Sequence, residues 1–432
     1  MTFTKSFCSS PWTHMRITNS GTYEPCRWMH KDGRRTVDFN NSIATTSPLT
    51  YFQKTMSGIR KELLDGNSLK MCKDCYVMDQ YDKPSGRRRQ LLKAGVQDEY
   101  FEKSLASSTL KESFDYSAAT QGHTKRYVTD WQIDLGNFCN SACVFCDPNS
   151  SSRLAAEFLQ LGLIKEMPPS SWCDDPVQLN TFIKDLVASP ELSYIHFLGG
   201  ETLITPGFKK ILTALVDAGI ATNIVIGFTT NLTVWSDSMI ELLTKFKQVH
   251  LGMSIETLTE INDYVRYPSN ISSVKVCLDR WITLGKQHEW LMQLRITPTC
   301  LTVHDLTTVY DYAWENKISV ESCNFLDNPK YMRLGVLPLE IRSAAIDKLT
   351  SWINAHPTNI TGTIINTRSP DLVLPQIVHD ATSYLAFLNN APDESDRLPD
   401  LIRFLKTIET TRKNSILTYL PQYEQLFRAA GY

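Results

Sequence analysis

Six short segments rich in β-branched and aromatic residues alternate with helical patterns in the middle of the chain. They cover residues 127–135, 194–199, 223–229, 249–255, 291–297 and 319–325. Strands that alternate with helices predict a parallel sheet with right-handed crossovers, either open or curved into a partial barrel. Functional sites of such sheets lie at the C-terminal ends of the strands.

The regions on either side of this core differ from it. Residues 1–110 are polar and rich in Cys and Arg, as expected of a small domain organised by a metal. We interpret residues 107–125 as a connecting segment. From residue 337 the patterns are helical and carry no chemical motif. The predicted α/β fold thus has a small cysteine-rich N-terminal domain (1–110), a partial (β/α)6 barrel (125–336) and a helical C-terminal extension (337–432).

Composition excludes several classes of protein. Lys plus Arg number 44 against 46 Asp plus Glu, so no global field attracts nucleic acid or an anionic membrane. The start of the chain lacks the apolar core of a signal peptide, and no apolar run is long enough to span a bilayer. We therefore expect a cytoplasmic protein with no membrane partner. In that reducing compartment, eleven cysteines indicate metal ligation or catalysis rather than disulfides.

The sequence CNSACVFC at 139–146 follows directly on the first predicted strand. Three thiolates at CxxxCxxC spacing on one loop can each bind one iron of a cubane cluster, which leaves the fourth iron without a protein ligand. That open iron can chelate the amino and carboxylate groups of a methionine moiety. The same three thiolates could instead hold zinc, with its fourth position left to water or a distant ligand.

The cysteine loop resembles the signature of the radical S-adenosylmethionine (SAM) superfamily, in which the residue before the last cysteine is usually aromatic. The resemblance continues strand by strand from residue 127 to about residue 336. LGGE at 198–201 is similar to the family's GGE motif. TTN at 229–231 is similar to its TNG motif, with Leu232 in place of glycine, and MSIE at 253–256 is similar to its serine–x–aspartate end, with Glu256 in place of aspartate.

This resemblance implies a partial radical SAM barrel and an enzyme that cleaves SAM reductively to a 5'-deoxyadenosyl radical. The radical then abstracts hydrogen from a substrate. The catalytic 4Fe-4S cluster would be held by Cys139, Cys143 and Cys146. SAM would be contacted by Phe145, Gly199, Gly200, Glu201, Asn231, Ser254, Glu256 and Arg266. Within this set, the GGE motif would meet the ammonium group, the strand end near Glu256 the ribose, and Arg266 the carboxylate.

A second group of cysteines lies near the N-terminus, at Cys8, Cys26, Cys72 and Cys75. Cys8, Gly21 and Cys26 are spaced as in the opening of the SPASM/twitch signature, which holds an auxiliary 4Fe-4S cluster in relatives. Here the module precedes the barrel, whereas it usually follows it. Four thiolates would saturate a second cluster, which favours an electron-relay or structural role. A four-cysteine structural zinc site is the alternative.

The favoured substrate is a peptide or protein side chain, because relatives with SPASM or twitch modules mostly act on these. A small-molecule dehydrogenase or mutase on the same scaffold is the alternative, and an RNA-modifying enzyme or a non-catalytic metal-binding scaffold is less favoured. An electron donor such as flavodoxin or ferredoxin is expected. GRRRQ at 86–90 could steer an acidic substrate or RNA, but a solvated charged face is the commoner explanation, so nucleic acid is an unfavoured partner. We expect His196, within an apolar strand, to be a hydrogen-bonded core histidine.

Overall fold

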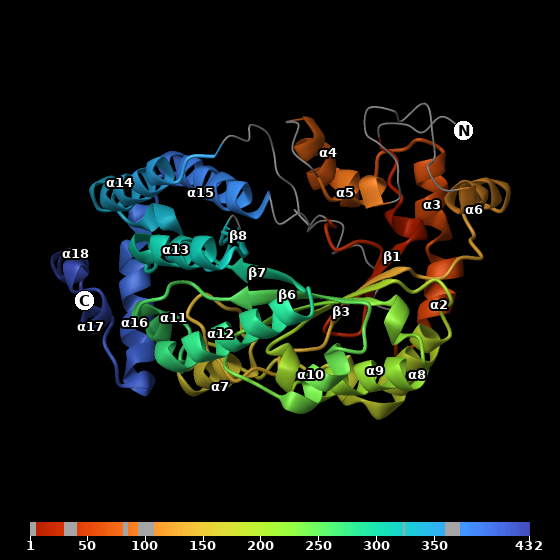
Figure 1. The fold of residues 1–432 in the computed structure, drawn as a ribbon, viewed down its shortest axis with the longest axis horizontal. Coiled ribbons are helices and arrows are strands. Elements are labelled where there is room, and N and C mark those ends of the chain that lie inside the picture. The colour runs from red at the N-terminus through yellow and green to blue at the C-terminus, as the bar shows by residue number, and fades with distance from the viewer. Residues whose placement is uncertain (1–5, 30–40, 81–84, 94–107, 323–324, 359–371) are drawn as a thin grey trace.

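The fold is described from a computed structural model of the chain (Figure 1). It describes residues 6–29, 41–80, 85–93, 108–322, 325–358 and 372–432. Cys323, the first residue of the predicted connecting segment (107), and residues 1–5, 30–40, 81–84 and 94–107 of the predicted N-terminal domain fall outside these ranges. Within them, no helix is both long enough and apolar enough to cross a membrane.

A single eight-stranded sheet runs through the molecule in the order β2-β1-β3-β4-β5-β6-β7-β8. All six predicted strands are present and pair in parallel with their neighbours, as predicted. Their bounds are Asp130–Asp134 (β3), Tyr194–Leu198 (β4), Val225–Thr230 (β5), Gln248–Ser254 (β6), Leu291–Arg295 (β7) and Ser319–Glu321 (β8).

Two N-terminal strands extend this sheet, and the strand patterns did not predict their place in it. Strand β1 (His14–Ile17) pairs in parallel with β3, and β2 (Tyr23–Glu24) pairs antiparallel with β1. The turn between them contains Gly21 at φ +79°, where a side chain would be strained. The sheet thus continues from the predicted barrel region into the cysteine-rich N-terminal residues.

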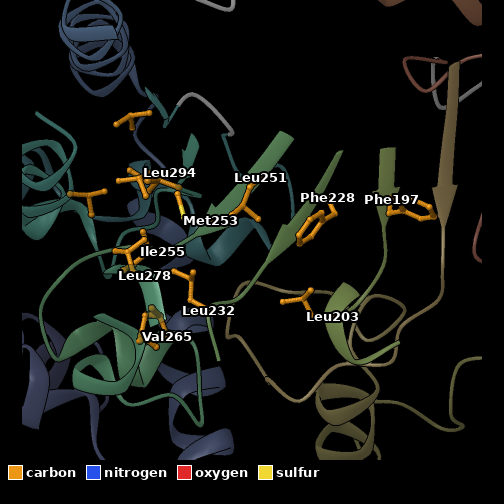
Figure 2. Packing of buried hydrophobic residues seen from close by; sticks show 14 of the residues in the cluster. Phe197, Leu203, Phe228, Leu232, Leu251, Met253, Ile255, Val265, Leu278 and Leu294 are labelled. Carbon is orange, nitrogen blue, oxygen red and sulfur yellow. The ribbon is translucent and has the colours of Figure 1, made fainter. Parts of the chain in front are cut away.

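The two faces of the sheet differ in polarity because side chains alternate along each strand. One face is apolar: Phe197 of β4 and Phe228 of β5 both pack against Phe208 of α9. Figure 2 shows these two phenylalanines on neighbouring strands, with Leu251 of β6 beside them. Helices cover this face (Figure 1): α7 (Ser152–Gln160), α8 (Pro176–Val187), α9 (Pro206–Asp217), α10 (Asp237–Leu243) and α12 (Ile271–Gln287).

Polar and charged side chains occupy the alternate positions, on the other face of the sheet. Arg16 of β1 pairs with Asp134 of β3, and Tyr194 and His196 of β4 stack with their rings nearly parallel. Figure 1 shows α4 (Lys73–Gln80), α5 (Gly86–Lys93), α14 (Leu339–Ala355) and α15 (Val373–Asn390) on this side of the sheet. The apolar core of the sheet therefore lies on the opposite face.

The C-terminal region is helical, as predicted. After α13 (Thr307–Asn316) and β8, the chain forms α14 and α15, then α16 (Leu398–Arg412), α17 (Ile416–Tyr419) and α18 (Glu424–Ala429). Helix α15 covers the outer edge of β8, where the side-chain amide of Gln376 accepts from Val320 N at 3.1 Å and donates to Val320 O at 2.6 Å. The amide thereby continues the hydrogen-bond ladder that would otherwise end at this edge.

The N-terminal elements build a second, smaller core. Its buried residues come from η1 (Ser10–Trp12), α3 (Ser57–Leu64), α5, α6 (Ser108–Ala119) and the chain between them: Phe7, Cys8, Trp12, Leu63, Leu91, Leu110 and Phe114. The expected connecting segment is wrong over Ser108–Ala119, because these residues form helix α6. Phe114 packs edge-on against Trp12 at 4.9 Å between ring centroids, and Trp12 Nε1 donates to Ser117 Oγ at 2.9 Å. Tertiary packing thus stabilises a helix of low intrinsic propensity.

Candidate active site

The cysteine loop lies between the C-terminal end of β3 and the start of α7. Its backbone is fixed by the segment before Pro268: Ala142 N donates to Tyr267 O at 2.6 Å, and Val144 N donates to Val265 O at 2.9 Å. Ser151 caps α7 by accepting from Leu154 N, and its hydroxyl donates to Ser141 O at 2.6 Å. The three cysteines are therefore held on a loop with a defined shape.

The GGE segment packs directly on the cysteine loop. Gly200 N donates to Gly136 O and Glu201 N donates to Phe138 O, each at 2.9 Å. A Cβ at Gly200 would lie 2.3 Å from Phe138 O, and one at Gly199, where φ is +151°, would lie 2.9 Å from Gly136 O. Because these are backbone contacts that cannot swing aside, the approach requires glycine at both positions.

Glu201 is buried at 1% exposure, and its carboxylate is engaged by the neighbouring backbone. Oε2 accepts from Asn231 N at 2.6 Å, while Oε1 accepts from Leu203 N at 3.2 Å and from Thr230 Oγ1 at 3.0 Å. Burial raises the pKa of Glu201 to about 7, and these donors act against the rise. The side chain therefore joins the ends of β4 and β5.

The TTN segment at the end of β5 reaches back to the same loop. Asn231 Nδ2 donates to Asn140 Oδ1 and to Ser141 Oγ, each at 2.9 Å. Leu232, which stands where the family motif has glycine, keeps a left-handed φ of +63° and is buried. A leucine here costs roughly 1 kcal/mol in backbone strain, so its buried side chain must compensate.

Glu256 and Arg266, which we expected to contact SAM separately, form a buried ion pair with one another. Glu256 Oε1 lies 2.5 Å from Arg266 Nη2 and 3.1 Å from Nε, and Oε2 accepts from Thr297 N at 2.7 Å. Arg266 Nη1 lies 4.0 Å from Cys143 Sγ, and its guanidinium lies over the Phe145 ring at 5.5 Å. The pair thus places a cation beside the cysteine loop. Ser254 ends β6 and is half-buried.

The three thiols of this loop influence one another. Burial raises the pKa of Cys139 to about 11 and that of Cys146 to about 12, and Cys143 adds to the rise at both. Burial also raises the pKa of Cys143, whereas the charges of Arg266 and Arg412 oppose the rise. A metal that binds thiolates would displace these protons. Three adjacent thiols form a donor set that fits one 4Fe-4S cluster with an open iron.

The four N-terminal cysteines come together although they are up to 67 residues apart in the sequence. Cys8, Cys26, Cys72 and Cys75 line one cavity, together with Trp28, Met71, Arg87 and apolar side chains. Burial raises the pKa of Cys26 to about 12 and that of Cys72 to about 11, and other cysteines of the group add to both shifts. Four thiols around one cavity fit a metal or cluster site.

Arg87, part of GRRRQ, belongs to this site rather than to an open basic patch. It is buried, lies 2.6 Å from Asp79 Oδ2 and donates to Phe7 O at 3.1 Å. Arg88 also faces Asp79, at 3.5 Å. The side chain of Arg89 lies outside the described residues. The sequence pattern missed this role because Asp79 is separated from the arginines by several residues and shows no motif.

Among the residues that the structure describes, no group of three or more His, Cys, Asp or Glu side chains is arranged to hold a metal ion. A single zinc ion would hold its sulfurs about 3.8 Å apart, because each lies about 2.3 Å from the metal. Cysteines that bind different irons of one cluster stand further apart. The spacing between the sulfurs thus distinguishes a single-ion site from a cluster site.

His196 lies on the polar face of the sheet. Its Nδ1 lies 3.4 Å from Tyr194 Oη, and the side chain is half-buried. Burial, aided by the charge of Arg295, lowers the pKa of His196 to about 3. The imidazole is therefore neutral at physiological pH. The neighbouring Gly227 makes room for it, since a Cβ there would lie 2.5 Å from His196 Nδ1.

The parallel sheet and the cysteine loop at its strand ends are those expected of a radical SAM domain. Comparison with known families agrees with this expectation. Residues 133–287 match the family described as the Radical SAM superfamily. Residues 133–287 thus resemble a radical SAM domain, and this similarity indicates an enzyme. The family implies a 4Fe-4S cluster and SAM as cofactors. No curated protein matches the chain.

Several solved structures resemble parts of the chain. Native anSMEcpe with bound AdoMet is 18% identical, with 52% of this chain and 60% of that chain covered and a TM-score of 0.39. Streptococcus suis SuiB bound to precursor peptide SuiA is 19% identical over 66% of this chain and 60% of that chain, at a TM-score of 0.35. The structure of TYW1 with a lysine-pyruvate adduct bound is 13% identical, with 54% of this chain and 74% of that chain covered and a TM-score of 0.29. The chain thus spans about three-fifths of the length of the first two.

Proposed function

We propose that the chain binds a 4Fe-4S cluster through Cys139, Cys143 and Cys146 and cleaves SAM reductively at the C-terminal ends of the strands. One observation supports this above all others. The cysteine loop is hydrogen-bonded to the GGE segment, to Asn231 of TTN and to the residues on either side of Arg266. Three segments that resemble family motifs in the sequence therefore meet the cysteine loop, which resembles a fourth.

The residues of this chain would divide the work of binding SAM. Gly199 and Gly200 would let the backbone approach the methionine moiety. Glu201 would hold this segment in place through the hydrogen bonds that its carboxylate accepts. Arg266 would attract the SAM carboxylate with Nη1, the guanidinium nitrogen that does not contact Glu256. Glu256 would orient the guanidinium through the other two nitrogens. Phe145, Asn231 and Ser254 would complete the contacts. The cluster, when bound, supplies the electron that cleaves SAM, after which the 5'-carbon takes a hydrogen atom from the substrate.

A peptide or protein side chain is the substrate class that we favour. The similarity of the N-terminal cysteines to a SPASM/twitch module supports it, and the polar face of the sheet offers charged groups to a polar chain. A small metabolite undergoing oxidation or rearrangement is the alternative. A small electron carrier such as flavodoxin or ferredoxin would supply the electron. The burial of Arg87 and its pairing with Asp79 weaken the case for RNA, because the first arginine of the densest basic run is not free to bind phosphate.

We also propose that the four N-terminal cysteines hold a second 4Fe-4S cluster. Their cavity lies beside the smaller core, and the similarity of Cys8, Gly21 and Cys26 to the opening of the SPASM/twitch signature favours a cluster over zinc. With all four irons ligated by cysteine, this site would relay electrons or stabilise the fold.

Production of 5'-deoxyadenosine tests the central proposal. The anaerobically reconstituted protein, given dithionite and SAM, is expected to form it, and the Cys143→Ala variant is expected to lose at least a hundredfold of that rate. Cys277→Ala is the matched control, since Cys277 is a buried cysteine on α12 outside both groups. Equal rates in the wild type and in Cys143→Ala would remove the catalytic assignment.

A further inference from the structure

Arg412 is the last residue of α16, in the C-terminal extension where the sequence shows no motif. Its side chain is fully buried, at 0% exposure. Nη2 donates to Ala142 O at 2.8 Å, within the cysteine loop and next to Cys143. A residue 270 positions away in the sequence thus contacts the backbone between the first two cysteines.

The same guanidinium is held from a second side by α7, the helix that follows the cysteine loop. Nε lies 2.8 Å from Glu157 Oε1, and Nη2 lies 2.6 Å from Oε2, a two-point ion pair. Thr411 Oγ1 also donates to Glu157 Oε1, at 2.9 Å. The plane of Arg412 lies over the Tyr267 ring at 4.8 Å. The C-terminal extension therefore fastens both the loop and the helix after it.

The position of the charge matters as well as the contacts. Nη1 of Arg412 is buried and has no hydrogen-bond partner among the described residues. Leaving such a donor unpaired is costly, so it indicates a negative or electron-rich neighbour at this place. The contact with Ala142 O places this charge beside the residue that precedes Cys143, and Glu157 holds the guanidinium from α7.

We infer that Arg412 is a positioning residue that ties the C-terminal extension to the cysteine loop and makes the bound cluster easier to reduce. This inference rests on the proposed cluster at Cys139, Cys143 and Cys146. A buried cation close to an anionic cluster lowers the energy of adding an electron. Arg412 thereby connects the folding of the C-terminal extension to the electron transfer on which SAM cleavage depends.

The test is an anaerobic redox titration of the reconstituted full-length protein, following the EPR signal that SAM perturbs. Arg412→Gln should lower the equilibrium constant for cluster reduction about tenfold, or 59 mV for one electron. Glu157→Gln removes the opposing negative charge and should leave this constant unchanged or raise it. Both variants should lose iron to a chelator several times faster than the wild type, because both release the loop.

A fall in Arg412→Gln that Glu157→Gln does not share separates an electrostatic role from a merely structural one. Arg412→Lys keeps the charge, and Thr411→Val removes one bond of the clamp without changing charge; both should stay within threefold of the wild-type constant. A fall in Glu157→Gln equal to that in Arg412→Gln would overturn the inference, as would an unchanged constant in Arg412→Gln. If Arg412→Gln does not fold, the equilibrium constant for cluster reduction in Glu157→Gln decides: a rise supports the inference and a fall overturns it. A wild type that shows this titration but forms no 5'-deoxyadenosine would overturn the proposed function and leave the Arg412 result standing.

Discussion

At the scale of single residues, Gly200 and its neighbour determine how closely two motifs can approach. The backbone of the GGE segment lies against the carbonyl groups of Gly136 and Phe138, so the fit depends on the absence of two side chains. Leu232 differs from these glycines, because a large side chain is present there although the backbone is left-handed. The same local geometry thus tolerates leucine where space is available and requires glycine where backbone lies opposite.

Gly200→Ala tests this constraint. The new Cβ would overlap Phe138 O, so the loop or the strand end must move. Overpacking of this kind costs about 1–3 kcal/mol, and we expect a loss of that size in chemical denaturation. We also expect at least a tenfold loss of 5'-deoxyadenosine formation. Gly58→Ala in α3 is the control, since nothing lies within 4 Å of its Cβ position and stability should hold or rise. Equal stabilities of the two variants would contradict the argument.

His196 gives a prediction about pH. Its pKa is lowered to about 3 in the folded protein, mainly by burial, whereas an unfolded histidine titrates near 6.5. Below pH 6.5 His196 is therefore protonated in the unfolded chain but stays neutral in the folded chain. The free energy of unfolding consequently decreases as the pH falls toward 3. One such proton contributes up to about 1.4 kcal/mol per pH unit. His196→Gln should reduce the slope of unfolding free energy between pH 6.5 and 4.5 by part of that amount. An identical slope in both proteins would count against it.

At the scale of secondary-structure elements, α15 substitutes for a missing strand at the edge of the sheet. Gln376 engages both the N–H and the C=O of Val320, which is fully buried. Asp380, one turn further along, accepts from Ser322 N, Ser322 Oγ and Tyr310 Oη. The helix thus binds the backbone of β8 and the residue that follows it through polar side chains rather than through apolar packing alone.

Gln376→Ala should expose the edge of β8. Two buried backbone groups of Val320 would lose their partners, which costs about 1–3 kcal/mol, and the loss should appear in urea denaturation curves. Gln287→Ala is the matched control, because this exposed glutamine ends α12 and should change stability by less than about 0.5 kcal/mol. Faster amide exchange at β8 in Gln376→Ala alone would identify the edge as the cause. A stability loss no greater than that of Gln287→Ala would refute it.

The elements that the sequence predicted are those with strong local signals. Six strands carry period-two or continuous apolar patterns, so local propensity and tertiary structure agree. Strands β1 and β2 are only four and two residues long, and they form because β3 supplies a pairing edge. Helix α6 is rich in Ser and has a weak pattern, so its existence depends on packing against Trp12. Such non-local causes leave no trace in a sequence window.

The same distinction divides the candidate site. The meeting of the cysteine loop, the GGE segment and Asn231 was predictable because each motif follows a strand end, and parallel strands bring their ends to one edge. The pairing of Glu256 with Arg266 was not predictable, since either side chain alone suggested a direct SAM contact. Arg412 gave no signal, because its partners Ala142 and Glu157 precede it by more than 250 residues.

At the scale of the whole molecule, one sheet joins two cores of unequal size. The large core follows the apolar face of the sheet and continues into the C-terminal helices. Within the residues that the structure describes, the smaller core contains seven buried side chains, including Cys8. So few apolar residues bury too little surface to order a region of this size unaided, and small cores generally need a metal or a crosslink. The cysteine cavity beside this core is the natural place for one.

Cys72→Ser combined with Cys75→Ser tests whether a metal site orders this region. If a second cluster is present, the reconstituted wild type should hold about eight irons per chain and the double variant about four. Amide exchange should then rise in α4, α5 and α6, because a small core without its ligated centre opens at low cost, while β4 to β7 keep their protection. Cys173→Ser is the control, since Cys173 donates to Leu135 O in the large core.

About four irons and one zinc in the wild type, with only the zinc lost in the double variant, would show a zinc site in place of the second cluster. Unchanged metal content together with unchanged exchange would show that the N-terminal fold holds without any metal at these cysteines.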